Sequence, residues 1–186
     1  MGYLSEEQLS GLGFKSMGRH VLISDKASIY NAEQIEIGDY SRIDDFCVIS
    51  GKVRIGRNVH IAIFCNIAGG VRGVDIGDFS GVAYGSHVFS QCDDFSGGTM
   101  TNPTVPAKFK QETKKAVTIG RHVLIGTSSL VLPGVTLAEG TAVSARSMIT
   151  ASTEPWSLYF GCPAKWVGSR KKDLLKLEAD FLVECP

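Results

Sequence analysis

The sequence predicts an all-β protein whose chain winds as a left-handed parallel β-helix of about six coils. Two observations predict this fold: a large aliphatic residue recurs at every sixth position, and a small residue usually sits four positions after it. A period of six fits neither the 3.6-residue repeat of an α-helix nor the two-residue alternation of a simple strand. It fits a chain that runs straight, turns and repeats, so that three sides close a triangular coil of about eighteen residues.

Each predicted side contributes one inward aliphatic residue to every coil. The first side holds Met17, Ile37, Ile55, Ile76, Ile119 and Leu137, the second holds Ile23, Ile43, Ile61, Val82, Ile125 and Val143, and the third holds Ile29, Ile49, Ile67, Val88, Val131 and Ile149. We expect these side chains to stack from coil to coil, with small residues allowing tight corners and glycine supplying any unusual dihedral angles. A β-sandwich rich in Ile-Gly turns is the alternative, and the number of in-phase matches disfavours it.

Three segments follow from the repeat. Residues 1–16 are expected to form an N-terminal cap helix, because Ser5-Glu-Glu-Gln8 resembles a capping box. Residues 17–160 form the β-helix, with a loop inserted at 89–118. Residues 161–186 hold an exit motif and an amphipathic C-terminal helix, since a coiled solenoid needs covers at its ends. The aliphatic and aromatic face of that helix comprises Leu174, Leu175, Leu177, Phe181 and Leu182.

The composition excludes several classes of protein. Lys plus Arg and Asp plus Glu both total 19, and this balance argues against nucleic acid or an anionic membrane as the main partner. The N-terminus lacks the pattern of a signal peptide, and no apolar stretch approaches the ~18 residues that span a bilayer. Five cysteines without close pairs fit a reducing compartment. We therefore expect a cytoplasmic protein without an integral membrane segment.

The repeat and the motif Gly161-Cys-Pro-Ala-Lys165 together resemble the hexapeptide-repeat acyltransferases, over roughly residues 15–170. The pattern is close to the galactoside and maltose O-acetyltransferases and to the O-antigen and capsule sugar O-acetyltransferases. This resemblance implies a homotrimer with active sites between subunits and acetyl-CoA as co-substrate. The reaction it implies is acetylation of a sugar hydroxyl, of a small glycoside or of a precursor in the biosynthesis of lipopolysaccharide or another cell-surface polysaccharide.

Two other functions fit the same scaffold. An N-acetyltransferase acting on a nucleotide-linked amino sugar is the main alternative; such enzymes often carry an added N-terminal nucleotide-binding domain, and its absence favours the O-acetyltransferase. A γ-class carbonic anhydrase needs three zinc-binding histidines, two of them typically spaced H-x4-H. The histidines here are His20, His60, His87 and His122, and no pair has that spacing. We therefore expect no metal site.

The resemblance leaves the position of the catalytic base open. O-acetylation needs a group that takes the proton of the attacking hydroxyl, and histidine suits this task. In the resembled enzymes the histidine follows the third-side aliphatic by five residues, which is Asp93 here, and an assisting asparagine from the neighbouring subunit falls on Ala62. Both positions depart from the family pattern.

Two histidines can replace the missing one. His60 lies at the corner between the first and second sides, and we hypothesise that it pairs with Asp93 or Asp94 of a neighbouring subunit. His87, at the corner between the second and third sides, is the other candidate, and an aspartate base or an inactive site also remains open. His20 and His122 are expected to be solvated corner residues.

The inserted loop is the expected acceptor site, because long loops without periodicity are often functional. Asp94, Ser96, Thr101 and Asn102 offer hydrogen bonds to sugar hydroxyls, and Phe95 offers a ring to stack on a sugar. A lid or a trimer-packing arm is the alternative.

The donor site is expected near the last coils, in the groove between two subunits. Positions that match the family's contacts to the pantetheine arm are Ser128, Ser129, Ala145, Thr150 and Ala151. Lys165 and Arg170 are candidates for the CoA phosphates, because their charge and hydrogen bonding suit phosphate. Trp156 and Trp166 are candidates to flank the adenine, with core packing as the alternative.

Overall fold

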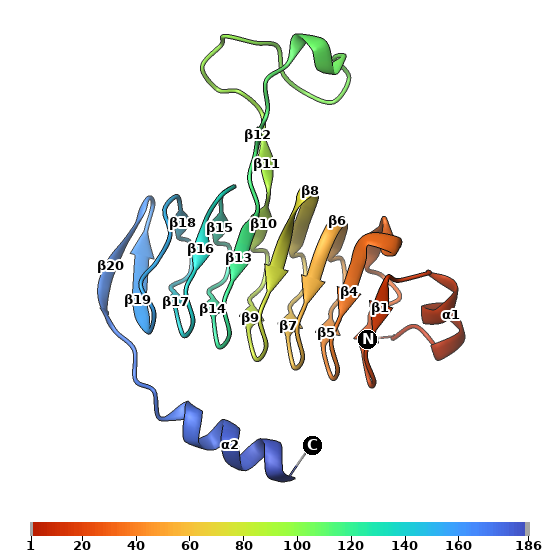
Figure 1. The fold of residues 1–186 in the computed structure, drawn as a ribbon, viewed down its shortest axis with the longest axis vertical. Helices are drawn as coiled ribbons and strands as arrows, with labels where there is room; N and C mark the ends of the chain where they lie inside the picture. Colours follow the sequence, from red (N-terminus) through yellow and green to blue (C-terminus); the bar gives the residue numbers. More distant parts are fainter. Residues whose placement is uncertain (1, 185–186) are drawn as a thin grey trace.

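A computed structural model of the chain describes residues 2–184 and shows a three-sided parallel β-helix (Figure 1). The first wall contains β1 (Ser16–Met17), β4 (Ile35–Ile37), the later part of β6 (Val48–Ile55) and of β8 (Asn66–Ile76), β13 (Val117–Ile119) and β16 (Thr136–Leu137). The second wall contains β2 (Leu22–Ile23), β5 (Arg42–Ile43), β7 (His60–Ile61), β9 (Gly81–Val82), β14 (Leu124–Ile125), β17 (Ala142–Val143) and β19 (Ser157–Gly161). The third wall contains β3 (Ser28–Tyr30), the beginnings of β6 and β8, β10 (His87–Phe89), β15 (Leu130–Val131) and β18 (Met148–Ile149).

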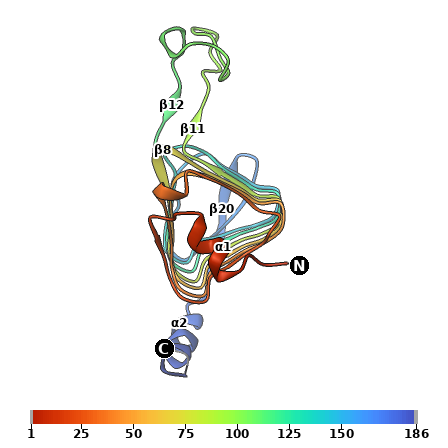
Figure 2. The ribbon, with the colours of Figure 1, turned by 90° about the vertical axis from the view of Figure 1, so that its right-hand side faces the viewer.

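The predicted fold is confirmed, with six complete coils and a seventh turn that ends in β19. Viewed along its axis the solenoid is triangular (Figure 2). We call its edges the first (between the first and second walls), the second (between the second and third walls) and the third (from the third wall to the next coil). Strands in successive coils pair in parallel, as in Arg42↔His60 and His60↔Gly81, and the register shifts where β6 pairs with β8.

The core contains the aliphatic residues that the repeat singled out, together with further side chains such as Val53, Val74 and Val117. Of the eighteen predicted inward side chains, all are buried except Met17 and Ile29. Met17 is 36% exposed, and the prediction was wrong there because the first coil has no preceding coil against it. Helix α1 (Glu6–Gly11) covers part of this open end through buried Leu9, and its N-terminus has the expected capping box of Ser5 and Gln8.

Glycine supplies the left-handed dihedral at some corners, as expected, at Gly85, Gly134 and Gly140, but not at most of them. The left-handed dihedrals lie three residues after the aliphatic, and mostly on large side chains such as Tyr40, Phe46, Phe64 and Phe79. Glycines directly after the aliphatics are needed for another reason, since a Cβ on Gly120 would lie 2.7 Å from the backbone nitrogen of Glu139 in the next coil. Successive coils approach too closely there for any side chain.

The inserted loop and the C-terminal segment differ from their predicted boundaries. The loop leaves after β10 and rises on a two-stranded stem, β11 (Gln91–Cys92) paired with β12 (Thr113–Lys114), and a 3-10 turn lies at Ala107–Phe109 (Figure 1). It ends before β13, so the predicted end at 118 is two residues too long. The motif at 161–165 forms the turn between β19 and the antiparallel strand β20 (Ala164–Ser169), which the repeat did not predict.

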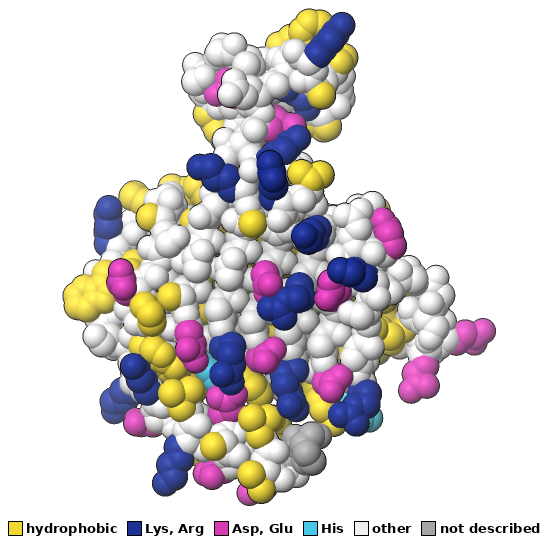
Figure 3. All heavy atoms as spheres, in the orientation of Figure 1, with side chains coloured by type: hydrophobic (Ala, Val, Ile, Leu, Met, Phe, Trp, Pro, Cys, Tyr) yellow, Lys and Arg dark blue, Asp and Glu magenta, His cyan; other side chains and the backbone are white. Residues whose placement is uncertain are grey.

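Helix α2 (Leu174–Glu184) follows β20 and lies along the first edge. Another 3-10 turn at Ala32–Gln34 interrupts the third edge of the first coil. The first wall faces the viewer in Figure 3, and acidic and basic side chains of successive coils alternate across it. Among them Arg54 of β6 pairs with Asp75 of β8. This wall therefore presents a charged surface to solvent.

Candidate active site

His60 lies at the start of β7 on the outward face of the second wall, next to the corner at which the sequence placed it. Its Nε2 atom is 2.8 Å from Oδ2 of Asp44 and 2.9 Å from Nη2 of Arg42. Both partners come from β5 and the residue after it, one coil earlier. The side chain of Asp44 is only 4% exposed, whereas that of His60 is 43% exposed. A buried carboxylate therefore contacts one nitrogen of a histidine whose side chain is otherwise partly exposed to solvent.

His87 begins β10 on the third wall, at the opposite end of one side of the triangle from His60. Its neighbours in register are Asn66 of β8 and Leu130 of β15. The ring is half-buried. His60 and His87 thus occupy different edges, and one chain does not bring them together.

Asp93 and Asp94 directly follow β11 in the inserted loop, and Figure 1 shows that this loop rises from the opposite side of the solenoid to the β7 turn. Oδ1 of Asp93 accepts from the backbone N–H of Asn102 at 3.3 Å. Asp94 accepts from the N–H groups of Ser96 and Thr99 at 2.8 and 3.1 Å. These bonds, those from Ser96 foremost, lower the pKa of Asp94. The hypothesised pairing with His60 is open only to a second copy of the chain.

The loop residues expected to contact the acceptor are exposed. Phe95 is 92% exposed, and Ser96, Thr101 and Asn102 are exposed as well. Asn102 also has a structural role, because its Oδ1 accepts from the N–H and hydroxyl of Thr104. The loop therefore presents an aromatic ring and several polar groups above the third edge.

The residues expected to bind the donor lie on different edges of the solenoid, and five of them are exposed on or near the second and third edges. Ser128 and Ala145 are exposed on the second edge in successive coils, and exposed Lys165 lies in β20 at the end that leads to this edge. Thr150 and Ala151 are exposed beyond the end of β18, towards the third edge. These residues remain available to a ligand that runs along the last coils.

Ser129 does not fit its expected role. It is fully buried, its hydroxyl donates to the carbonyl of Ser144 at 3.1 Å, and its N–H donates to Ser86 at 3.2 Å. Both polar groups bond within the solenoid, so the expectation of a pantetheine contact was wrong. A small buried residue four positions after an aliphatic is a corner residue that joins neighbouring coils.

Arg170 lies on the first edge, away from Lys165 and the second-edge positions. Its Nη1 donates to the carbonyls of His122 and Gly140 at 2.6 and 3.0 Å, and burial lowers the pKa of its guanidinium. These bonds attach the segment between β20 and α2 to the solenoid. Arg170 therefore does not share one phosphate site with Lys165.

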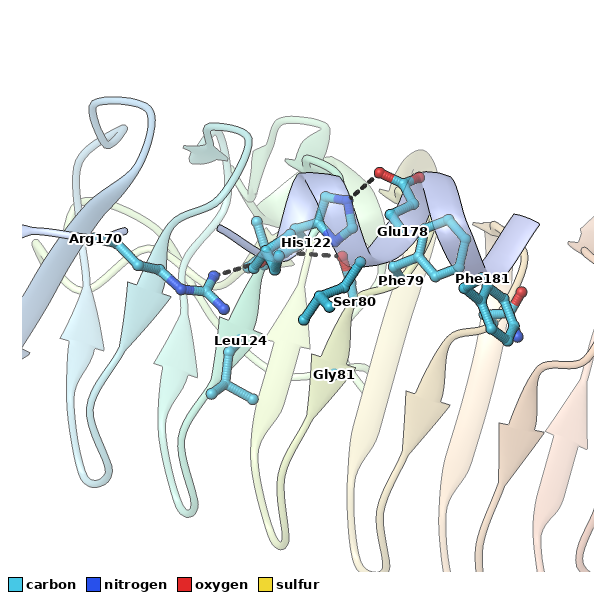
Figure 4. Close-up of a pocket in the computed structure, with 12 residues that line it drawn as sticks. Phe79, Ser80, Gly81, His122, Leu124, Arg170, Glu178 and Phe181 are labelled. Atoms are coloured by element: carbon cyan, nitrogen blue, oxygen red, sulfur yellow. Dashed lines mark hydrogen bonds and ion pairs between the residues drawn. The ribbon is translucent and has the colours of Figure 1, made fainter. Parts of the chain in front are cut away.

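A hollow of about 490 Å³ separates α2 from the second wall and is lined mainly by apolar side chains (Figure 4). At one end Glu178 of α2 reaches the ring of His122, with its Oε2 2.9 Å from Nε2, and also contacts Arg121. His122 is buried, so the expectation of a solvated corner residue was wrong. It stacks on Phe79, which Phe181 of α2 meets edge-on.

The two tryptophans differ. Trp156 is buried over Gly140 at the end of the solenoid, as core packing predicts, whereas Trp166 on β20 is 57% exposed. Between residues 2 and 184 no group of three or more His, Cys, Asp or Glu side chains is placed to hold a metal ion. Over the same residues no helix has the length and apolar character that crossing a bilayer requires.

Sequence reasoning missed Asp44 and Arg42 as partners of His60. A signal was present, because a coil of about eighteen residues places each residue beside the one eighteen positions earlier. Arg42 precedes His60 by eighteen positions, and Asp44 precedes Ala62 by eighteen positions. The position expected for an assisting asparagine is thus next to the buried carboxylate, one coil later.

Comparisons with known proteins cover almost the whole chain. It is 42% identical over 184 residues to the dTDP-4-amino-4,6-dideoxy-D-glucose acyltransferase of Escherichia coli, covering 97% of this chain and 95% of the relative. It is 42% identical to AntD, an N-acyltransferase from Bacillus cereus solved in complex with dTDP and 3-hydroxybutyryl-CoA, with a TM-score of 0.97 over 99% of this chain and 98% of the other.

A third relative is more distant. A putative lipopolysaccharide biosynthesis O-acetyl transferase of Escherichia coli K12 is 30% identical over 149 residues, covering 77% of this chain and 72% of the relative. No protein-family model matches the chain.

The relatives that match this three-sided parallel β-helix and its protruding loop from end to end are acyltransferases. The chain belongs to the hexapeptide-repeat β-helix acyltransferases, as the relatives of full length show. The predicted family and the predicted acyltransferase activity are confirmed. The relatives favour the N-acyltransferase alternative over the O-acetyltransferase, and they match this chain end to end without an added nucleotide-binding domain.

Proposed function

We propose that the protein transfers an acyl group from acyl-CoA to the amino group of a dTDP-linked amino sugar of the 4-amino-4,6-dideoxyglucose type. The observation that carries this proposal is similarity over the full length, 42% identity, to an acyltransferase named for that acceptor. AntD, solved with 3-hydroxybutyryl-CoA bound, supports an acyl donor longer than acetyl-CoA. The proposal keeps the acyl-CoA co-substrate that the sequence analysis expected. It differs in the acceptor group, which is an amine instead of a hydroxyl.

The reaction forms an amide. The amine nitrogen of the acceptor attacks the thioester carbonyl, the new C–N bond forms, and the C–S bond breaks to release CoA as a thiolate that then takes up a proton. The attacking nitrogen must lose a proton, and His60 or His87 is positioned on the outer surface to accept it. The loop residues Phe95, Ser96, Thr101 and Asn102 are proposed to contact the acceptor.

The proposed active unit is a homotrimer with sites between chains. The outward residues of the second wall support this arrangement, because most of them are uncharged. The uncharged residues on either side of Arg42 and His60 are Leu22, Gly81, Leu124 and Ala142. Leu22 is 42% and Leu124 is 48% exposed in the single chain. Unlike the charged first wall, this surface suits contact with another copy.

The experiment measures CoA release with acetyl-CoA and 3-hydroxybutyryl-CoA against a panel of dTDP-amino sugars, matched dTDP-sugars without the amine, and simple glycosides. We expect turnover only with an amino sugar and a product that resists alkaline hydroxylamine, because an amide survives this reagent and an ester does not. A hydroxylamine-labile product would instead establish the O-acetyltransferase that the more distant relative represents. No release with any acceptor contradicts the proposal.

The two histidines are distinguished by separate substitutions. We expect His60→Ala or His87→Ala to lower kcat by at least about 100-fold, the lower range for a lost general base. The variant that keeps its kcat identifies the histidine without this role. Full activity in both variants would exclude a histidine base and leave an aspartate as the remaining candidate.

A further inference from the structure

The structure supplies His60 with a carboxylate from its own chain. We infer that Asp44 is a positioning residue, which holds the proton of His60 on Nε2 and so leaves Nδ1 free to accept the proton of the acceptor amine. This inference rests on the proposed function. It replaces the hypothesised partners Asp93 and Asp94 with a residue one coil away from His60.

The first argument is the burial of Asp44. Its side chain is 4% exposed, and its backbone N–H donates to the carbonyl of Ile61 at 3.0 Å, which fixes the residue between two coils. A buried carboxylate is costly unless charged or hydrogen-bonding groups satisfy it. Within the described residues Oδ1 has no hydrogen bond of acceptable geometry. The N–H of His60 adds a donor at Oδ2, beside Arg42 Nη2, and so helps to satisfy a carboxylate whose other oxygen lacks such a bond.

The second argument concerns the competition for Nε2. Arg42 Nη2 lies 2.9 Å from Nε2, and a donation from it would place the ring proton on Nδ1. The guanidinium has another acceptor, since Nη2 donates to Oδ2 of Asp44 at 3.2 Å and Nε lies 2.9 Å from Oδ1. Its side chain is also 44% exposed to solvent. The buried anion thus decides the tautomer, with its Oδ2 2.8 Å from Nε2.

The third argument is the open side of the ring. The strands that flank β7 are β5 and β9, and β9 presents Gly81, which has no side chain to cover the imidazole. The charged groups that face His60 from these strands are Arg42 and Asp44, both on the Nε2 side. With 43% of its side chain exposed, the His60 ring has an open side towards the cleft expected between two copies. A group aligned in this way accepts a proton and then carries a positive charge that Asp44 stabilises.

The test compares Asp44→Asn with the matched control Asp45→Asn. The asparagine amide can donate to Nε2, which would move the ring proton to Nδ1 and block its use as an acceptor. We expect Asp44→Asn to lower kcat for the dTDP-amino sugar by about 100-fold or more with little change in the KM for acyl-CoA. Asp45 bonds to Ser24 and Lys26 instead, so its substitution should leave kcat within about threefold.

A spectroscopic measurement tests the same inference without any variant. Two-bond ¹⁵N–¹H spectra of the wild-type protein at neutral pH should show the Nε2–H tautomer for His60, and those of Asp44→Asn the Nδ1–H tautomer. A wild-type ring protonated on Nδ1 overturns the inference, even if Asp44→Asn does not fold. So does an Asp44→Asn protein with the kcat and pH profile of the wild type. A wild type without activity on any amino sugar refutes the proposed function and leaves the tautomer measurement intact.

Discussion

Single residues set how closely the coils approach. Left-handed backbone positions at the edges carry large rings that stack on the next coil, as Phe46 does on Phe64 at 5.1 Å between ring centroids. Stacking across coils compensates for a backbone conformation that is unfavourable for non-glycine residues. Glycine directly after the aliphatic is required for another reason, because the backbone of the next coil leaves no room for a Cβ there. Side-chain size, rather than conformational freedom, therefore explains the Ile-Gly pairs.

The glycine argument predicts a large effect for Gly120→Ala. The added Cβ would lie 2.7 Å from the nitrogen of Glu139, so the coils must separate. We expect a loss of about 1–3 kcal/mol in the free energy of unfolding, the usual range for overpacking. Urea unfolding measures it, with Gly11→Ala as the control because nothing lies within 4 Å of a Cβ there. Equal stability of the two variants would contradict the argument.

At the scale of elements, the inserted loop depends on one carboxylate. Asp94 accepts hydrogen bonds from Ser96 and Thr99, and these bonds lower its pKa. A depressed folded-state pKa stabilises the loop above the ordinary pKa of aspartate, and this stabilisation is lost as the pH falls through the folded value. We expect the amide signals of Ser96 and Thr99 to titrate below about pH 4. Asp94→Asn should abolish this titration. A midpoint above pH 4 would contradict the lowered pKa of Asp94.

Helix α2 depends on a small contact with the first edge. Glu178, whose side chain is 10% exposed, contacts His122 and Arg121, and the hollow beside it leaves much of the helix unpacked. We expect Glu178→Gln to raise amide hydrogen exchange in residues 174–184 by about tenfold, the effect of losing one hydrogen bond to a charged group. Asp180→Asn on the exposed side of the same helix is the control. Unchanged exchange would show that the aromatic contacts suffice.

At the scale of the whole molecule, the repeat predicted the solenoid because each coil depends mainly on its neighbours. Ile43, Ile61 and Val82 are recognisable without knowing any distant contact. The pairing of Asp44 with His60 depends on how side chains outside the repeat meet across coils. Likewise, the six-residue period carries no information on where α2 docks or on the reversal at β20. The identity of the acceptor could not be predicted, because the polar and aromatic groups of the loop suit many similar sugars.

The loop is predicted to be separable from the solenoid. Its two ends are joined by the Lys115 N–H donating to the Ser90 carbonyl at 2.9 Å, and β8 pairs directly with β13 beneath it. We therefore expect replacement of residues 91–114 by a short Gly-Ser turn to change the melting temperature by less than about 5 °C, since closing a shorter loop costs little. Calorimetry should show CoA binding retained, with acyl transfer lost. Unfolding of the variant would show that the loop supports the coils.

The molecular mass of the protein in solution tests the proposed trimer. Sedimentation equilibrium should give three times the 20.0 kDa of the chain, and Leu124→Arg on the second wall should shift the population towards monomer. Arginine places an unpaired charge in the proposed contact between copies. Tyr30→Arg on the exposed third wall is the control. A monomeric wild type with full acyl transfer would contradict sites shared between chains.

The strand that reverses direction at the end of the solenoid has a further consequence. Stacked parallel coils leave unpaired backbone groups at the last coil, and another molecule could extend them into a fibre. Here β20 runs antiparallel along β19, and Thr153 bonds to the backbone of Thr136 and Ala138 on the neighbouring wall. An incoming molecule thus meets a strand of the wrong polarity on one wall and occupied hydrogen-bonding groups on another. On the second wall the hairpin therefore disfavours end-to-end stacking of one solenoid on another.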